Sequence, residues 1–275
     1  MRIGVSGASG KLGAATVREL KALGGGHEIV AISRTPEAVG EADAARQGDY
    51  DRPETLRAAY EGLDRLLLIP TSDLRRGRRA AQNVAAIDAA VAAGVGHIVL
   101  ISGAGTRAVE EPHIWASYYD AQQRLIQTAP KWSILRMNYY AESFADEAKA
   151  SLAHGAITGL GENRVAFVSR DDLAAAAAGL LTGEGHAGAI YNGTGPAAFS
   201  GAERAAIVAE VSGRPVGFAV LPEDTLRAGL AGAGLPPEVI DTIVSIQKTF
   251  LTGAYDIVTA GIEHLSGKPP RPLRD

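Results

Sequence analysis

The chain has 275 residues, 46% hydrophobic and 21% charged, which is enough to bury a large core. A formal net charge of −4 gives no general attraction to nucleic acid or to an anionic membrane, so we expect neither as a partner. The absence of cysteine excludes disulfides, thiol catalysis and thiolate metal sites and is compatible with the cytoplasm, as is the absence of a secretion-like leader.

The first half of the chain alternates between two hydrophobic periodicities. Apolar runs without alternation predict buried strands, and apolar residues at helical spacing predict the helices between them. This alternation indicates right-handed crossovers and an α/β fold, a Rossmann-like, doubly wound parallel sheet. In chain order we expect strand 1–6, helix 11–23, strand 27–34, helix 35–46, strand 47–50, helix 53–61, strand 65–69, helix 75–93, strand 97–102, helix 117–128 and strand 132–136.

The regular alternation loosens after about residue 140. Short strands are predicted over 156–158, 165–168, 189–191 and 216–220, with helices over 170–181, 200–211, 222–229 and 236–251. We therefore divide the chain into a dinucleotide-binding domain (1–140) and a smaller α/β substrate-binding lobe (141–275), with some strands of the second half returning to the sheet.

A glycine-rich loop, VSGASGKLG, joins the first strand to the first helix. Its spacing favours a positive φ at Gly7, close approach of a pyrophosphate at Gly10, and tight helix–strand packing at Gly13. The helix that follows presents free N–H groups to a phosphate. No lysine–serine or lysine–threonine pair follows a glycine at the spacing of an ATP-binding P-loop. The predicted contacts from this loop to a dinucleotide are Gly7, Ser9, Gly10, Lys11, Leu12 and Gly13.

The end of the second strand indicates which dinucleotide is bound. An NAD site usually has an acidic residue here for the ribose 2′-hydroxyl, but this chain has Arg34 and no carboxylate before Glu37. Arg34 can pair with a 2′-phosphate, and Lys11 adds a second positive charge. Asp49, after the third strand, is placed to contact the adenine edge. The predicted cofactor is NADP(H).

The remaining candidates follow later strands, because ligands cross the carboxyl ends of strands in open α/β sheets. Tyr139 and Tyr140 are candidates to wall a flat substrate. The other predicted cofactor contacts are Pro70, Thr71, Ser72 and Ser102.

An ordered set of motifs makes the chain resemble a known family. The motifs are SGASGKLG, SRTP, GDYDRPETL, PTSD, AAVAAGVGHIVLIS, LRMNYYAES, VSRDDLA and the terminal GKPPRPL. Together they resemble the NmrA-like branch of the atypical short-chain dehydrogenases, and within it the type 2 quinone oxidoreductases. The resemblance implies a Rossmann domain with a small C-terminal lobe, a preference for NADPH, and hydride transfer to quinones in the enzymatic members.

One departure from ordinary short-chain dehydrogenases limits the chemistry. Those enzymes use a Ser…Tyr-x-x-x-Lys set, in which the lysine charge favours the tyrosine phenolate. Ser102 and Tyr118 are present here, but Gln122 and Gln123 stand where lysine is expected. Alcohol dehydrogenation is therefore poorly supported, whereas an electron-poor quinone needs mainly positioning beside the cofactor. The candidate catalytic residues are Ser102, Tyr118 and Tyr140, and the expected substrate is small and aromatic or quinone-like.

Several alternatives remain open at the level of sequence. His113 is either a proton donor in a lid or a surface-loop residue, and the cluster RRGRR (75–79) either contacts an anion or is a solvated helix face. The histidines have no metal-ligand spacing, so no metal site is expected. Two other functions fit: a non-catalytic NADP(H)-sensing regulator, or a reductase or isomerase of one secondary metabolite. The oligomeric state is open, with a homodimer as one option.

Overall fold

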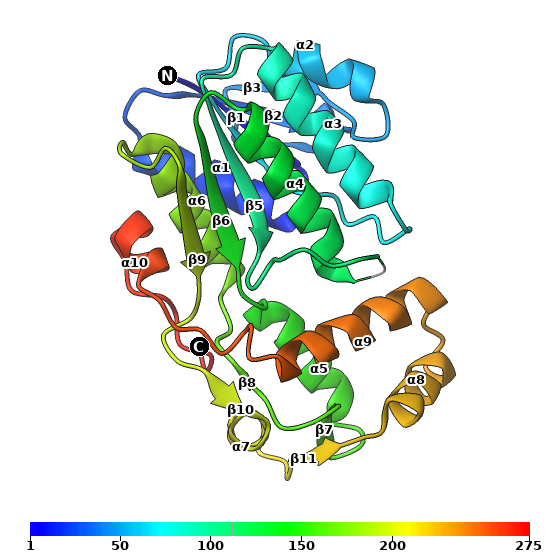
Figure 1. Cartoon of the computed structure of the whole chain (residues 1–275). Helices are drawn as coiled ribbons and strands as arrows, with labels where there is room; N and C mark the ends of the chain where they lie inside the picture. The colour runs from blue at the N-terminus through cyan, green and yellow to red at the C-terminus, as the bar shows by residue number, and fades with distance from the viewer. Residues whose placement is uncertain (112) are drawn as a thin grey trace.

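A seven-stranded parallel sheet forms the centre of the molecule in the computed structural model, which describes residues 1–111 and 113–275 (Figure 1). The spatial order of its strands is β3-β2-β1-β4-β5-β6-β9, so the order reverses between β1 and β4. The predicted doubly wound sheet is confirmed, and a ligand crevice is expected at this reversal. The strands are β1 (Arg2–Ser6), β2 (Glu28–Ser33), β3 (Ala44–Gln47), β4 (Arg65–Leu68), β5 (His97–Gly103), β6 (Trp132–Met137) and β9 (Ala189–Gly193).

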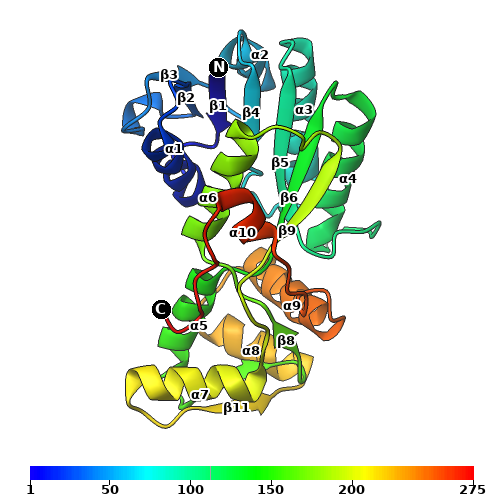
Figure 2. The same cartoon turned by 90° about the vertical axis from the view of Figure 1, so that its left-hand side faces the viewer.

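Helices cover both faces of the sheet, as the near-continuous apolar strands require. One face packs on α1 (Lys11–Leu23), α6 (Arg170–Thr182) and α10 (Gly261–Ser266); the other packs on α2 (Leu56–Tyr60), α3 (Arg78–Ala92) and α4 (Ile114–Thr128). Figure 2 shows α6 and α10 on the side of the sheet opposite α3 and α4. In β5, Val99 and Ile101 face the first layer while Ile98 and Leu100 face the second.

The prediction of a helix over residues 35–46 and a strand over 47–50 is wrong. Only a 3₁₀ turn, η1 (Pro36–Ala38), forms there, and β3 starts at Ala44. The Asp43 carboxylate explains the start of the strand: it accepts hydrogen bonds from the Ile29 amide at 2.8 Å and from Lys21 Nζ at 2.5 Å. These contacts bring the segment beside β2, and pairing with β2 outweighs local helix propensity.

Two helices on the α3–α4 face begin at different residues from those expected. The helix predicted from residue 75 begins at Arg78, after Gly77 with φ +72°, because Arg75 is held in a turn by Asp73. The helix predicted from residue 117 begins at Ile114, since the His113 ring caps it by accepting the Trp115 amide at 3.2 Å. A short 3₁₀ turn, η2 (Pro53–Thr55), precedes α2.

A smaller lobe lies below the sheet in Figure 1, beyond the carboxyl ends of β5 and β6. It holds two small two-stranded sheets, the parallel pair β7–β11 and the antiparallel pair β8–β10. Its core includes Phe144, Phe167, Phe250 and Tyr255. Its elements are α5 (Ala141–Ser151), β7 (Ala156–Gly159), β8 (Arg164–Val165), β10 (Phe199–Ser200), α7 (Gly201–Ser212), β11 (Gly217–Val220), α8 (Glu223–Gly232) and α9 (Pro237–Leu251).

The second half of the chain thus supplies both the lobe and part of the central layers. Between lobe elements, α6 and β9 return to the sheet, and α10 packs against α6 near the end of the chain. The chain must therefore pass repeatedly between lobe and sheet, which positions the lobe over the carboxyl edge. In the described part of the chain, no helix has the length and apolar character needed to cross a membrane.

Candidate functional site

The loop between β1 and α1 is shaped by its glycines. Gly7 has a φ of +89°, and its amide and that of Ala8 both donate to the Ile32 carbonyl, at 3.0 and 3.1 Å. A Cβ on Gly13 would lie only 2.3 Å from the Gly7 carbonyl oxygen, so only glycine lets α1 approach the loop this closely. Gly10 caps α1 without any side-chain hydrogen bond, which leaves the first N–H groups of the helix available to an anion.

A cavity of about 230 Å³ opens beside this loop, at the reversal of strand order. Eight of the predicted cofactor residues line it: Gly7, Ser9, Gly10, Arg34, Asp49, Pro70, Thr71 and Ser72. The lining residues that sequence reasoning missed are Ser6, Ser33, Gly48, Tyr50, Asp51, Ile69 and Gln82. The predicted residues therefore come from four strand ends that converge on one cavity.

Four predicted cofactor residues do not line this cavity. Lys11 is exposed in the first turn of α1, whereas Leu12 points into the core and is 6% exposed. Gly13 acts through close packing against the loop. Ser102 is fully buried at the end of β5. Of these four, Lys11 alone has a charged side chain free to reach a phosphate near the loop.

Ser33 ties the end of β2 to the glycine loop. Its hydroxyl donates to Ser9 Oγ at 2.8 Å and accepts the Thr35 amide at 3.1 Å. Arg34, between them, is exposed and belongs to the cavity lining. The arrangement holds a guanidinium at the cavity rim with its head group in water, where it can meet a phosphate.

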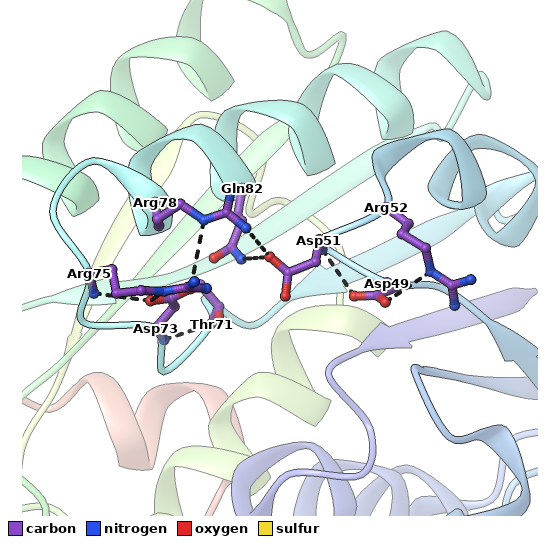
Figure 3. A network of polar contacts seen from close by, with 8 residues as sticks. All are labelled: Asp49, Asp51, Arg52, Thr71, Asp73, Arg75, Arg78 and Gln82. Atoms are coloured by element: carbon purple, nitrogen blue, oxygen red, sulfur yellow. Dashed lines mark hydrogen bonds and ion pairs between the residues drawn. The ribbon is translucent and has the colours of Figure 1, made fainter.

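A chain of ion pairs fixes the outer edge of the cavity (Figure 3). Asp49 accepts hydrogen bonds from Arg52 Nε at 3.2 Å and from the Asp51 amide at 3.0 Å. The Asp51 carboxylate in turn accepts from Arg78 at 2.5 Å and from Gln82 Nε2 at 2.8 Å. This links the loop after β3 to the start of α3. Asp49, predicted to contact adenine, is thus held in place by two donors while it lines the cavity.

The same network continues into the loop after β4. Arg75 donates to Asp73 from its side chain, at 2.9 Å from Nε, and from its backbone amide at 3.0 Å. The hydrogen bond from Arg75 and the nearby Arg78 charge lower the pKa of Asp73 to about 2. The Asp73 amide donates to Thr71 Oγ1 at 3.2 Å. Three arginines and three aspartates therefore bind the loops around the cavity to one another.

The floor of the cavity is a buried hydroxyl cluster. Tyr50 donates to Ile69 O at 3.0 Å, and its hydroxyl also lies 2.9 Å from Ser6 Oγ, within hydrogen-bond distance. Ser6 Oγ in turn lies 3.0 Å from the Tyr60 hydroxyl. Burial raises the pKa of Tyr50 to about 12, so its hydroxyl stays protonated. The signal in the sequence that could have identified Tyr50 as a cavity residue is its position just after a strand. It was missed because the strand was predicted over residues 47–50, whereas β3 ends at Gln47.

Ser102 is held by the residue that replaces the expected lysine. Gln122 Nε2 donates to Ser102 Oγ, and Arg136, on the neighbouring strand, donates to Gln122 Oε1 at 2.6 Å. Gln122 is 2% exposed and Ser102 is fully buried. The serine hydroxyl is thus engaged inside the protein, and the position of the lysine holds a neutral amide.

The two candidate tyrosines lie at the junction of sheet and lobe. Tyr118 is 6% exposed and packs over Gly103 at the end of β5. Tyr140 caps α5, and the Arg170 guanidinium carbon lies 4.9 Å from the centroid of its ring. Burial is the main cause that raises the pKa of Tyr140 well above its ordinary value, so its hydroxyl is neutral. Tyr139 points into the lobe, where its ring packs edge-on against Phe250.

Two of the histidines come together in the structure. His186 and His264 come together beside Tyr191, with the two imidazole centroids 6.2 Å apart, while His154 lies in the lobe. Across the described ranges 1–111 and 113–275, no group of three histidine or carboxylate side chains is arranged to hold a metal ion.

The residues around the cavity fit a dinucleotide. A glycine-lined cradle that a Cβ would fill, an uncapped helix start and an arginine at the end of β2 are each suited to phosphate groups. The loops after β4 and β5 lie at the carboxyl edge of the sheet, on the side that faces the lobe (Figure 1). The arrangement can therefore hold a phosphate-bearing cofactor.

Comparisons with known proteins agree with this geometry. Residues 7–184 match the model of the NAD(P)H-binding family. The chain is 33% identical to Quinone oxidoreductase 2 of Escherichia coli strain K12, covering 99% of this chain and 96% of the relative. It is 30% identical to the NAD(P)H azoreductase of Xenophilus azovorans, with 82% and 78% covered. The solved NADPH complex of an Escherichia coli NADPH-dependent quinone oxidoreductase superposes with a TM-score of 0.91 at 30% identity, covering 99% and 97%.

Proposed function

The chain belongs to the NAD(P)H-binding family, and on that premise we propose that it is an NADPH-dependent reductase of quinone-like, electron-poor acceptors. The observation that carries the proposal is the cavity lined by the glycine loop and Arg34, combined with a buried neutral Gln122 in the place where lysine was expected. The first feature provides for a hydride donor, and the second removes the charge that alcohol chemistry needs. The relatives named for quinone and azo-dye reduction support the same class of acceptor.

The cofactor would be held by the lining residues already described. The free N–H groups at the start of α1 would meet the pyrophosphate, and Arg34 with Lys11 would pair with the 2′-phosphate. Gly13 keeps α1 close enough for this, and the Asp51–Arg78 pair keeps the outer edge in place. When bound, NADPH supplies the hydride.

The acceptor would lie between the carboxyl edge of the sheet and the lobe. Tyr118 and Tyr140 lie at this junction, and the Tyr140 hydroxyl stays protonated. Ser102 is occupied by Gln122, so any role of this serine is to fix the end of β5 rather than to bind substrate freely. Proximity to the cofactor supplies much of the rate for a strongly electron-poor ring.

A cofactor-consumption assay tests the proposal. The purified chain is mixed with NADPH and, in separate reactions, with a naphthoquinone, an azo dye and an activated aldehyde, and the loss of NADPH absorbance is followed. We expect turnover with the quinone and little with a secondary alcohol and NADP⁺. If none of these acceptors supports NADPH oxidation, the result contradicts the proposal.

Isothermal titration with NADP⁺ and NADPH separates the remaining functions. A regulator would bind the oxidised cofactor at least as tightly as the reduced one and turn over no acceptor, whereas a reductase of one metabolite would ignore simple quinones. The homodimer, the cytoplasmic location and the substrate-binding role of residues 141–275 stay predictions, which size-exclusion chromatography, cell fractionation and lobe variants can each test.

A further inference from the structure

Four arginines surround the start of α3, and three of them have polar partners. Arg75 and Arg78 donate to carboxylates of the network at the cavity edge, and Arg76 donates to a backbone carbonyl at 3.5 Å. Within the described residues, Arg79 makes neither a hydrogen bond nor an ion pair, although its Nε is buried. A buried guanidinium N–H without an acceptor is unfavourable, so a ligand that accepts from it would stabilise the site.

Arg79 lines a small crevice next to the cofactor cavity. The crevice, about 40 Å³, is formed by the loop after β4, the start of α4 with His113 and Ser117, and Thr242 of the lobe helix α9. The loop after β4 is shared: Thr71 lines the cofactor cavity, and Asp73, whose amide donates to Thr71, lines the crevice. The two spaces therefore share the loop after β4, and the crevice also reaches the lobe through Thr242.

Among the described residues that line the crevice, the arginine without an ion-pair partner is Arg79. Asp73 is neutralised by Arg75, and Glu111 contributes the second carboxylate of the lining. Glu111 makes no ion pair with Arg79, and its backbone carbonyl accepts from Arg76 instead. The guanidinium of Arg79 is therefore available to an electron-rich atom of a bound molecule.

The Tyr118 ring holds this guanidinium near the end of β5. The guanidinium carbon lies 5.5 Å from the ring centroid, and an edge of the same ring packs against Gly103. In ordinary short-chain dehydrogenases the cation beside the corresponding tyrosine is a lysine of the same helix. Here that helix position holds the neutral Gln122, and a cation approaches the tyrosine from α3 instead.

We propose that Arg79 is a catalytic residue of acceptor reduction, contacting a carbonyl oxygen of a quinone-like acceptor and stabilising the negative charge that develops there. The inference rests on the proposed function. Hydride from NADPH would add to one carbonyl oxygen of the quinone and leave NADP⁺, while the ring π electrons shift to the opposite oxygen. That oxygen, which Arg79 contacts, becomes a phenolate, and a proton from water then gives the hydroquinone. A fixed cation at that oxygen stabilises the transition state more than the neutral ground state.

Steady-state kinetics on three variants test the proposal: Arg79→Gln, Arg79→Lys and, as the matched control, Arg76→Gln. Each is assayed with a series of para-quinones of graded reduction potential, and its NADPH affinity is measured by isothermal titration. We expect Arg79→Gln to lose about 100-fold in kcat/KM for the quinone while its NADPH affinity is unchanged. The loss should be largest for the least electron-poor quinones, Arg79→Lys should recover part of it, and Arg76→Gln should behave as the wild type.

The outcomes separate the two proposals. If the wild type turns over quinones and Arg79→Gln does so equally well, the role of Arg79 is overturned and the proposed function stands. A loss that is the same for every quinone and accompanied by weaker NADPH binding also overturns it, because that pattern indicates a structural role. If none of the tested acceptors supports NADPH oxidation by the wild type, both proposals fail.

Discussion

The side-chain amide of Gln122 donates to the hydroxyl of Ser102, and both side chains are shielded from solvent. The other end of the same amide accepts from Arg136 at 2.6 Å. A glutamine satisfies both neighbours because it carries a donor and an acceptor, whereas a lysine carries donors alone. Gln122 therefore forms an internal hydrogen-bond bridge between Ser102 and Arg136.

Replacing Gln122 with lysine should therefore destabilise the fold without creating an alcohol dehydrogenase. A lysine would place its charge beside the Arg136 guanidinium with no carboxylate to offset it, at a cost of about 3–5 kcal/mol. Urea unfolding of Gln122→Lys measures this free energy. Gln127→Lys, on the exposed side of the same helix, is the control and should unfold as the wild type does. Equal stability of the two variants would contradict the buried bridge.

Gly13→Ala should weaken cofactor binding. The added methyl would lie 2.3 Å from the Gly7 carbonyl oxygen and 2.7 Å from the Ala8 Cα, so α1 has to move away from the loop. We expect the Kd for NADPH to rise by at least about tenfold, which corresponds to about 1.4 kcal/mol. Gly229→Ala, in α8 with open space around it, is the matched control. Titration calorimetry on both variants checks the expectation, and an unchanged Kd for Gly13→Ala would exclude this loop as the phosphate site.

Arg34→Asp tests which dinucleotide is preferred. If Arg34 pairs with the 2′-phosphate, the substitution removes a charged hydrogen bond and adds repulsion, so NADPH affinity should fall by about 10- to 100-fold. NADH, which lacks this phosphate, should lose little or gain. Arg57→Asp, exposed on α2, should change neither affinity. Parallel titrations with the two cofactors measure the ratio, and unchanged NADPH binding would show that another residue is the partner.

The ion pair of Asp73 and Arg75 should make stability depend on pH in a defined window. The pKa of Asp73 is about 2 in the folded chain, below the value of about 3.9 expected in the unfolded chain. Because the folded value is the lower, the pair stabilises fully above about pH 4 and loses this contribution as the pH falls toward about 2.

Asp73→Asn, compared with the wild type in urea at several pH values, checks this window. The variant should be less stable near neutral pH, and the difference should vanish at the acidic end. The exposed Asp120→Asn serves as control and should show no such dependence. If the difference in the free energy of unfolding between Asp73→Asn and the wild type is the same at every pH, the effect comes from packing rather than from charge.

Local patterns in the sequence were sufficient to predict most strands of the parallel sheet, the glycine loop and the place of a basic residue after β2. These features depend on periodicity or on one backbone conformation within about ten residues, which is why they can be predicted without a structure. The error at residues 35–46 has the opposite cause. Alanine and glutamate favour a helix locally, but Asp43 bonds to Ile29 and pairs the segment with β2, a contact decided outside the segment.

The tertiary structure alone decided which distant residues share the site. Tyr50 closes the cavity floor against Ile69, and Asp51 reaches Arg78 across 27 positions of sequence, because the strand order brings the loops after β3 and β4 to the same edge. It also decided that Arg75 and Arg78 pair with aspartates, that Arg76 donates to a backbone carbonyl, and that Arg79 lines the crevice. The sequence by itself determined the glycine-rich loop between β1 and α1, and the presence of glutamine rather than lysine four residues after Tyr118. Which cation lies beside Tyr118 depended on how α3 packs against α4, and no spacing within either helix encodes that contact.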